Sequence, residues 1–174
     1  RVLKGTIEIP PSKSYSHRAV IGASLATSEK KSKISNLKFS MDIKATMEIM
    51  ENWGAKIIKG ENSLEIIGNS GKIIPKDKYT KCSESGSTIR FLIPVGLTSK
   101  NELVFDGKGK LVDRPLDSYY KIFEKQGLFY ETTDGKLPLT VNGELKPGIY
   151  EIDGNISSQF ITGLLYALPL LNGD

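Results

Sequence analysis

A single cysteine, Cys82, gives the chain no partner for an internal disulfide. With only one histidine, His17, the chain also has no Cys/His cluster to hold zinc and no site built on several histidines, so we expect no metal. No apolar run approaches the ~20 residues of a membrane-spanning helix. The chain opens at Arg1 without a signal-like segment, which favours a cytoplasmic protein with no membrane partner.

A dense basic stripe is also missing. Lys and Arg number 24 against 20 Asp and Glu, which gives a net charge of +4, and the one short run, Glu29–Lys33, is interpreted as a solvated loop. This mild excess favours small anionic partners and argues against nucleic acid. With 39% hydrophobic residues in 174, the chain has room for one good core or two small units.

A pattern of alternating strands and helices starts three times. The first unit predicts a strand over 5–10, helices over about 14–26 and 41–54, and strands over 55–59 and 64–68. The second predicts helices over 82–97 and 114–127 with strands over 102–107, 128–132 and 137–143. The third, a strand over 150–154 and a helix over 155–168, is cut short, so we expect the chain to be part of something larger.

Each unit opens a helix with small hydroxyl side chains. The stretch PPSKSYSHRAV brings Lys13 and Arg18 to the first of these corners, and Ser87 and Arg90 occupy the second. Helix N-termini have unpaired N–H groups and partial positive charge, so they attract anions, and the cations add charge-assisted bonds. Serine at any one corner is explained by helix capping alone. Three corners in register favour a shared cleft for phosphate or carboxylate.

Four segments resemble the signatures of the 5-enolpyruvylshikimate-3-phosphate synthase (3-phosphoshikimate 1-carboxyvinyltransferase) family. PSKSYSHRA resembles its P-G-S-K-S-x-S-x-R motif, ESGSTIRF its N-A-G-T-x-x-R loop, DRPLD its E-R-P segment and DGNISSQFITGLL its S-S-Q-F helix. The four occur in the family's order over nearly the whole chain. Pro11, Glu84 and Phe91 depart from the family pattern, which puts the detailed shape of the phosphoenolpyruvate pocket in question but leaves the main ligands in place.

The resemblance implies an α/β fold of repeated βαβαββ units in an inside-out, barrel-like domain. Residues 1–174 are then most of the first, shikimate 3-phosphate-binding domain, with units at about 5–68, 79–143 and 149–174, the last incomplete. The second domain is absent from the chain and is its expected partner within a monomeric enzyme.

The resemblance also implies the reaction. The family transfers the enolpyruvyl group of phosphoenolpyruvate to the 5-hydroxyl of shikimate 3-phosphate and releases phosphate, in the shikimate pathway to aromatic amino acids, with no metal or organic cofactor. The family's acidic base, and further Arg and Lys ligands for phosphoenolpyruvate, lie in the second domain. We therefore expect this chain to bind shikimate 3-phosphate weakly and to be inactive alone.

Matching the motifs residue by residue implies the site. Lys13 is the candidate catalytic residue and contacts both substrates. The residues implied for shikimate 3-phosphate are Lys13, Ser14, Arg18, Ser157, Ser158 and Gln159. Those implied for phosphoenolpyruvate are Lys13, Gly86, Arg114 and Gln159, with Ser87 and Arg90 in supporting positions.

Two alternatives stay open. UDP-N-acetylglucosamine enolpyruvyl transferase shares the fold and the chemistry, but it is expected to carry a reactive cysteine in the loop before its own R-P-V-D. The corresponding loop here, DGKGKLVDRP, has none, and Cys82 lies in another segment. A non-catalytic RNA- or phosphate-binding module predicts aromatic residues beside the basic corners, where only Tyr15 occurs.

Overall fold

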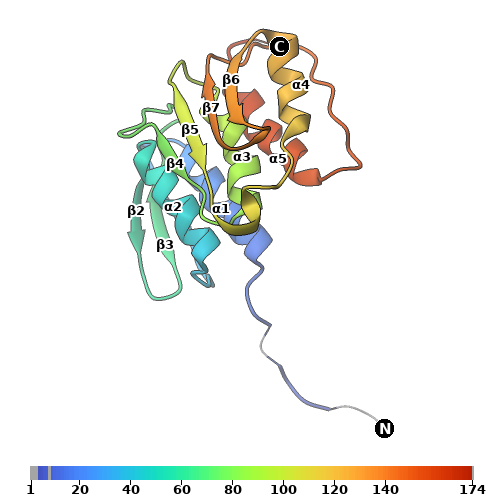
Figure 1. Cartoon of the computed structure of the whole chain (residues 1–174). Coiled ribbons are helices and arrows are strands. Elements are labelled where there is room, and N and C mark those ends of the chain that lie inside the picture. Colours follow the sequence, from blue (N-terminus) through green and yellow to red (C-terminus); the bar gives the residue numbers. More distant parts are fainter. Residues whose placement is uncertain (1–3, 8, 174) are drawn as a thin grey trace.

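The computed structural model describes residues 4–7 and 9–173, and it has a mixed α/β architecture with two sheets (Figure 1). This confirms the α/β class predicted from the sequence. The elements are α1 (Lys13–Leu25), β1 (Lys31–Ile34), α2 (Met41–Asn52), β2 (Lys56–Lys59), β3 (Leu64–Ile67), β4 (Tyr79–Lys81), α3 (Gly86–Gly96), β5 (Leu103–Asp106), η1 (Gly109–Leu111), α4 (Asp117–Gln126), β6 (Phe129–Thr133), β7 (Lys136–Asn142), α5 (Ser158–Ala167) and η2 (Leu168–Leu170). Within the described ranges, no helix has the length and apolar character needed to cross a bilayer.

The two sheets share one topology. The first has the strand order β1-β3-β2 with antiparallel neighbours throughout. The second has the order β4-β5-β7-β6, in which β4 is parallel to β5 and the other neighbours are antiparallel. Matching β1 with β5, β3 with β7 and β2 with β6 makes the two orders coincide. Among the described residues, no strand lies beside β1 at the place that β4 takes in the second sheet.

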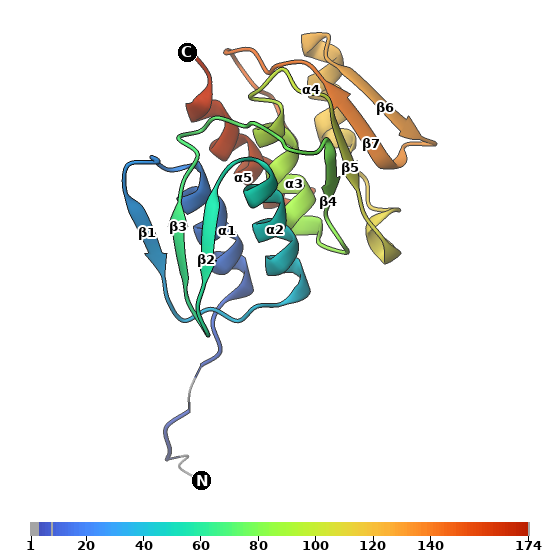
Figure 2. The same ribbon diagram turned by 90° about the vertical axis from the view of Figure 1, so that its left-hand side faces the viewer.

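Helices α1, α2, α3 and α5 pack together between the two sheets (Figure 2). They run in the same general direction, so their N-terminal ends gather at one end of the molecule. This arrangement positions the site described below.

Two apolar clusters hold the layers together. The smaller one joins α1 and α2 to the first sheet through side chains such as Val20, Ile43 and Leu64. The larger one surrounds α3 and includes Trp53 and Phe105, whose rings meet edge to face at 6.3 Å. Each such buried side chain contributes about 1.5–3 kcal/mol to folding.

Two predicted strands are wrong, and one loop is a strand. The described residues of 5–10 form no strand, and Ile7 and Ile9 are 84% and 75% exposed. Residues 150–154 form none either. A strand requires a hydrogen-bonded neighbour, and neither segment has one among the described residues. Conversely, the run Glu29–Lys33 is no simple loop, because Lys31–Ile34 pairs with β3 as an edge strand.

Candidate functional site

The starts of α1 and α2 are joined by an ion pair. Ser12 caps α1, and the next residue, Lys13, places Nζ 2.5 Å from Oδ2 of Asp42 in the first turn of α2. Ser40 is the N-cap of that helix, which leaves the Asp42 carboxylate free for the lysine. The sequence motifs did not indicate Asp42 as a partner of Lys13, because 29 residues separate the two and only the fold brings them together.

The start of α3 lies beneath Arg114. Ser85 caps the helix by accepting a hydrogen bond from Thr88 N at 3.1 Å. A Cβ on the following residue, Gly86, would overlap Nη1 of Arg114. Glycine at this position therefore lets the guanidinium from the loop before α4 lie directly on the first turn of α3.

The start of α5 is hydrogen-bonded to α3. Ser157 caps α5 and accepts from Gln159 N at 3.3 Å. The side-chain amide of Gln159 then bridges two residues of α3: Nε2 donates to Ser87 Oγ at 2.8 Å, and Oε1 accepts from Arg90 Nη1 at 3.0 Å. The three residues are 69 or more positions apart from one helix to the other, so this contact is wholly tertiary.

Arg18 connects α1 to α5. Its Nη1 donates to Ser14 Oγ at 2.5 Å, and its Nη2 donates to Thr162 Oγ1 at 3.2 Å. Its guanidinium carbon lies 5.0 Å from the centre of the Phe91 ring. Thr162, one turn after Ser158, is another site neighbour that the motifs did not indicate.

The arginines of this region have no carboxylate partners. None of the ion pairs among residues 4–7 and 9–173 involves Arg18, Arg90 or Arg114. Burial, and then the charge of Arg114, lower the pKa of the Arg90 guanidinium. Cations that face one another without a counter-charge make a strong site for phosphate or carboxylate.

A buried chain of hydroxyl groups joins three of the helices. His17 Nδ1 lies 2.9 Å from Thr46 Oγ1, which lies 2.8 Å from Thr88 Oγ1, which donates to Ser85 Oγ at 2.7 Å. Burial lowers the pKa of His17 to about 4, so the ring is neutral at pH 7. None of the sequence motifs indicated this series of hydrogen bonds, which links the Lys13 corner of α1 to the cap of α3.

The structure brings the predicted residues together through these links, except that the side chain of Ser158 makes no hydrogen bond among the described residues. Gly86 and Arg114 are in contact, Gln159 contacts Ser87 and Arg90, and the α1 residues reach the others through Asp42 and Thr162. Ser158 is exposed, and only its carbonyl oxygen is hydrogen-bonded within the described chain, to the Thr162 hydroxyl. Its side chain is therefore open to solvent at the start of α5.

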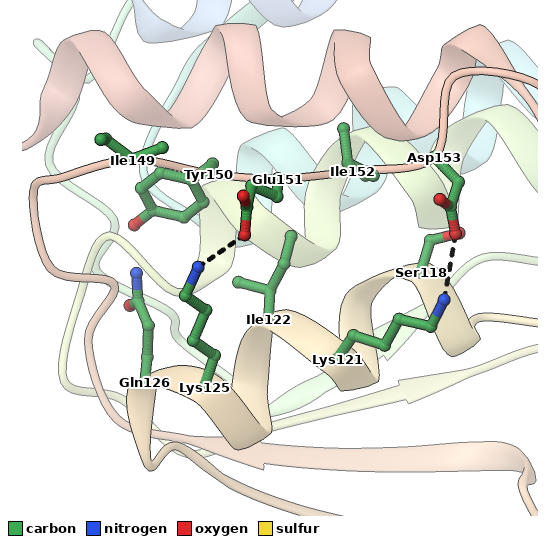
Figure 3. Close-up of a pocket in the computed structure, with 10 residues that line it drawn as sticks. All are labelled: Ser118, Lys121, Ile122, Lys125, Gln126, Ile149, Tyr150, Glu151, Ile152 and Asp153. Carbon is green, nitrogen blue, oxygen red and sulfur yellow. Dashed lines mark hydrogen bonds and ion pairs between the residues drawn. The ribbon is translucent and has the colours of Figure 1, made fainter.

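A separate pocket of about 320 Å³ lies between α4 and residues 149–153 (Figure 3). Its charged side chains are already paired: Lys125 Nζ lies 2.8 Å from Glu151 Oε2, and Lys121 Nζ lies 3.0 Å from Asp153 Oδ2. Because no cation there lacks a counter-charge, the pocket is poorly suited to an anion. The arginine-lined helix starts, with which it shares no residue, are the better candidate site.

Comparisons with known proteins agree on one family. A family model described as EPSP synthase (3-phosphoshikimate 1-carboxyvinyltransferase) matches residues 1–174. A 3-phosphoshikimate 1-carboxyvinyltransferase of Clostridium kluyveri is 54% identical over 172 residues, covering 99% of this chain and 40% of the relative. The one of Clostridium novyi is 52% identical over 180 residues, covering 99% and 41%. The chain thus spans about 40% of the length of the curated relatives it matches.

Solved structures agree on the fold. EPSP synthase from Acinetobacter baumannii matches with a TM-score of 0.84 at 24% identity, over 97% of this chain and 39% of that one. The enolpyruvyl transferase NikO from Streptomyces tendae matches with a TM-score of 0.56 at 13% identity, over 91% and 36%. At these identities the likeness extends to the fold alone.

Proposed function

The chain belongs to the EPSP synthase (3-phosphoshikimate 1-carboxyvinyltransferase) family, and from this premise we propose that the protein containing it transfers the enolpyruvyl group of phosphoenolpyruvate to the 5-hydroxyl of shikimate 3-phosphate. One observation carries the proposal: Arg18, Arg90 and Arg114 gather at the connected starts of α1, α3 and α5, and none of them has a carboxylate partner in the described part of the chain. Two multiply charged anions repel each other in water, and such a set of cations offsets that repulsion.

The helix starts divide between the two ligands. We assign shikimate 3-phosphate to the α1 and α5 starts, where hydroxyls and backbone N–H groups suit its phosphate, and phosphoenolpyruvate to the α3 start beneath the loop guanidinium. The residues assigned to shikimate 3-phosphate are Lys13, Ser14, Arg18, Ser157, Ser158 and Gln159. Those assigned to phosphoenolpyruvate are Lys13, Gly86, Arg114 and Gln159.

The reaction needs both ligands held in one orientation. The 5-hydroxyl oxygen of shikimate 3-phosphate bonds to C2 of phosphoenolpyruvate, the hydroxyl proton leaves, and the methylene carbon gains a proton. The tetrahedral intermediate then loses phosphate and a methyl proton, which restores the double bond. Lys13 stabilises the negative charge and is the candidate proton donor, held by Asp42. The remaining acid/base groups belong to the part of the protein beyond this chain.

The rival UDP-sugar reaction is less well supported. Its expected nucleophile is an accessible cysteine in the loop before Arg114, where this chain has none. Cys82 is fully buried, and burial raises the pKa of its thiol above the usual range, so it stays protonated and unreactive.

The same premise leads us to propose that the chain forms most of one domain. Its units are those at about 5–68, 79–143 and 149–174, and the matching strand orders of the two sheets support the first two. A cytoplasmic location and a monomeric enzyme stay predictions.

Titration of the isolated chain tests the function. We expect calorimetry to detect weak binding of shikimate 3-phosphate, none of UDP-N-acetylglucosamine, and no phosphate release when phosphoenolpyruvate is added. Arg18→Met should abolish the binding, whereas Lys125→Met, which removes an ion-paired lysine of the α4 pocket, should preserve it. Binding of the UDP-sugar without binding of shikimate 3-phosphate would reverse the assignment. Product formation would refute the need for a second domain.

A further inference from the structure

The orientation of the Gln159 side chain is fixed by its neighbour. A side-chain amide has an oxygen that accepts hydrogen bonds and an NH₂ group that donates them, and the two groups are similar in size and shape. Arg90 Nη1 lies 3.0 Å from one end of this amide, and a guanidinium can only donate. That end must therefore be the oxygen, Oε1, and the NH₂ group faces Ser87 at 2.8 Å.

Arg90 is itself held firmly enough to impose this choice. Its guanidinium carbon lies 4.8 Å from the centre of the Phe160 ring. Its Nε is buried and has no hydrogen-bond partner among the described residues. Water would solvate all the N–H groups of an arginine on the surface. The buried Nε shows that the Arg90 guanidinium is only partly solvated, so its position is set by the packing around it.

The hydrogen bonds then all point one way. Arg90 donates to Gln159 Oε1, and Gln159 Nε2 donates to Ser87 Oγ. Because Ser87 Oγ accepts, its own proton is free to point onward. The chain therefore ends in two donors at the α3 start, the Ser87 hydroxyl and the second hydrogen on Nε2. A flipped amide would instead present an oxygen lone pair to an anion.

We propose that Arg90 is a positioning residue, which holds Gln159 and Ser87 with their donors facing the bound anion and prevents the amide from flipping. The inference rests on the proposed function and extends it, because it assigns Arg90 a task that involves no contact with either substrate. It predicts that replacing Arg90 lowers the affinity for phosphoenolpyruvate strongly and the melting temperature only slightly.

Steady-state kinetics of the full-length protein test the proposal. Arg90→Met should raise the KM for phosphoenolpyruvate about ten- to a hundredfold, the size of one charge-assisted hydrogen bond. Arg90→Lys should restore part of that loss, since an ammonium group also only donates. Gln159→Glu should keep its pairing with Arg90 and its melting temperature but raise the same KM at least as much, because a carboxylate offers no N–H and repels the anion.

A matched control separates positioning from packing. Tyr119→Phe removes a buried hydrogen bond beside Arg90, and it should lower the melting temperature while leaving the KM within about twofold. If Arg90→Met is folded and keeps the wild-type KM, Arg90 is structural only and the inference is overturned, whatever Gln159→Glu does. If Arg90→Met does not fold, Arg90→Gln, which is uncharged but keeps a polar side chain, decides by the same criterion. If the wild-type protein does not turn over these substrates at all, the proposed function fails and takes the inference with it.

Discussion

Single residues decide how closely the cations approach the helix starts. Because Gly86 has no side chain, the guanidinium of Arg114 can lie against its α-carbon. The Oδ2 atom of Asp42 lies 2.5 Å from Nζ of Lys13 and holds that side chain in place. The motif made Gly86 predictable, because the sequence shows a glycine at a helix start. It did not make Asp42 predictable as a partner, since the pair depends on how α1 packs against α2.

Adding a methyl group at Gly86 tests the close approach. Gly86→Ala would overlap Nη1 of Arg114, which is the far end of a flexible side chain, so the guanidinium can move aside and the fold should lose less than about 1 kcal/mol. We expect the KM of the full-length protein for phosphoenolpyruvate to rise about tenfold or more, with the KM for shikimate 3-phosphate nearly unchanged. Equal loss of affinity for both substrates would contradict this division of the site.

His17 should make stability depend on pH. Burial is the main reason that its pKa falls from 6.5 to about 4, with Asp42 opposing the shift and Lys13 and Arg18 reinforcing it. Between pH 6.5 and 4 the unfolded chain therefore binds the proton more strongly than the folded one, and acidification favours unfolding. The contribution is complete above pH 6.5 and is lost as the pH falls towards 4.

The expected size of this effect is measurable by urea unfolding. For the two pKa values above, the free energy of unfolding should fall by about 2 kcal/mol from pH 7 to pH 5 on account of His17 alone. The variant His17→Gln, which has no group titrating in this range, should lose that part of the slope. A slope unchanged by the substitution would show that other groups cause the acid sensitivity.

At the scale of elements, the sequence pattern located most helices and strands because their hydrophobic periods are clear. It missed β4, which is only three residues long, and β1, whose sequence KSKI has the polar surface of an edge strand and little apolar signal. It began the helix that ends at Gly127 three residues early, at Arg114, whereas α4 begins at Asp117; Gly127 follows the last residue of that helix in a left-handed conformation. The hydrophobic pattern predicts which secondary structure a segment prefers, whereas packing against a neighbouring strand or helix decides whether the segment forms it and where it begins and ends.

The contact between α5 and α3 depends on Gly163. A Cβ there would overlap the carbonyl oxygen of Arg90, which belongs to the backbone and cannot move aside. Gly163→Ala should therefore force α5 away from α3, costing about 1–3 kcal/mol in the free energy of unfolding and separating Gln159 from Arg90.

A matched substitution elsewhere provides the control. Gly22 also lies inside a helix, and a Cβ there would meet only Tyr166 Cε1 at 3.9 Å, an ordinary contact. Gly22→Ala should stabilise the chain by about 0.5–1 kcal/mol, because alanine favours the helix. Urea unfolding of both variants should give shifts of opposite sign. Shifts of the same sign would show that helix propensity, rather than the close approach, controls Gly163.

At the scale of the whole molecule, the site could be predicted as a set of motifs but not as a geometry. The family signatures identified the cations and the small residues around them, since each lies within a few positions of the next. The links between corners, such as Arg18 to Thr162 across 144 positions, arise only because four parallel helices share one end. Short sequence motifs identify the residues of the site, whereas the packing of the repeated units brings those residues together.

The segment 4–10 offers the last prediction. Its apolar residues alternate as in a strand, yet Ile7 and Ile9 are 84% and 75% exposed, and in the described part of the chain no strand pairs with the outer edge of β1, where the second sheet has β4. Burying each of these side chains would contribute about 1.5–3 kcal/mol. Because the chain spans about 40% of its relatives' length, we expect the rest of the protein to supply the missing neighbour. Hydrogen exchange should find the Ile7 and Ile9 amides unprotected in the isolated chain and protected about a hundredfold or more in the full-length protein. Fast exchange in both would mean that this alternating pattern forms no strand in the full-length protein either.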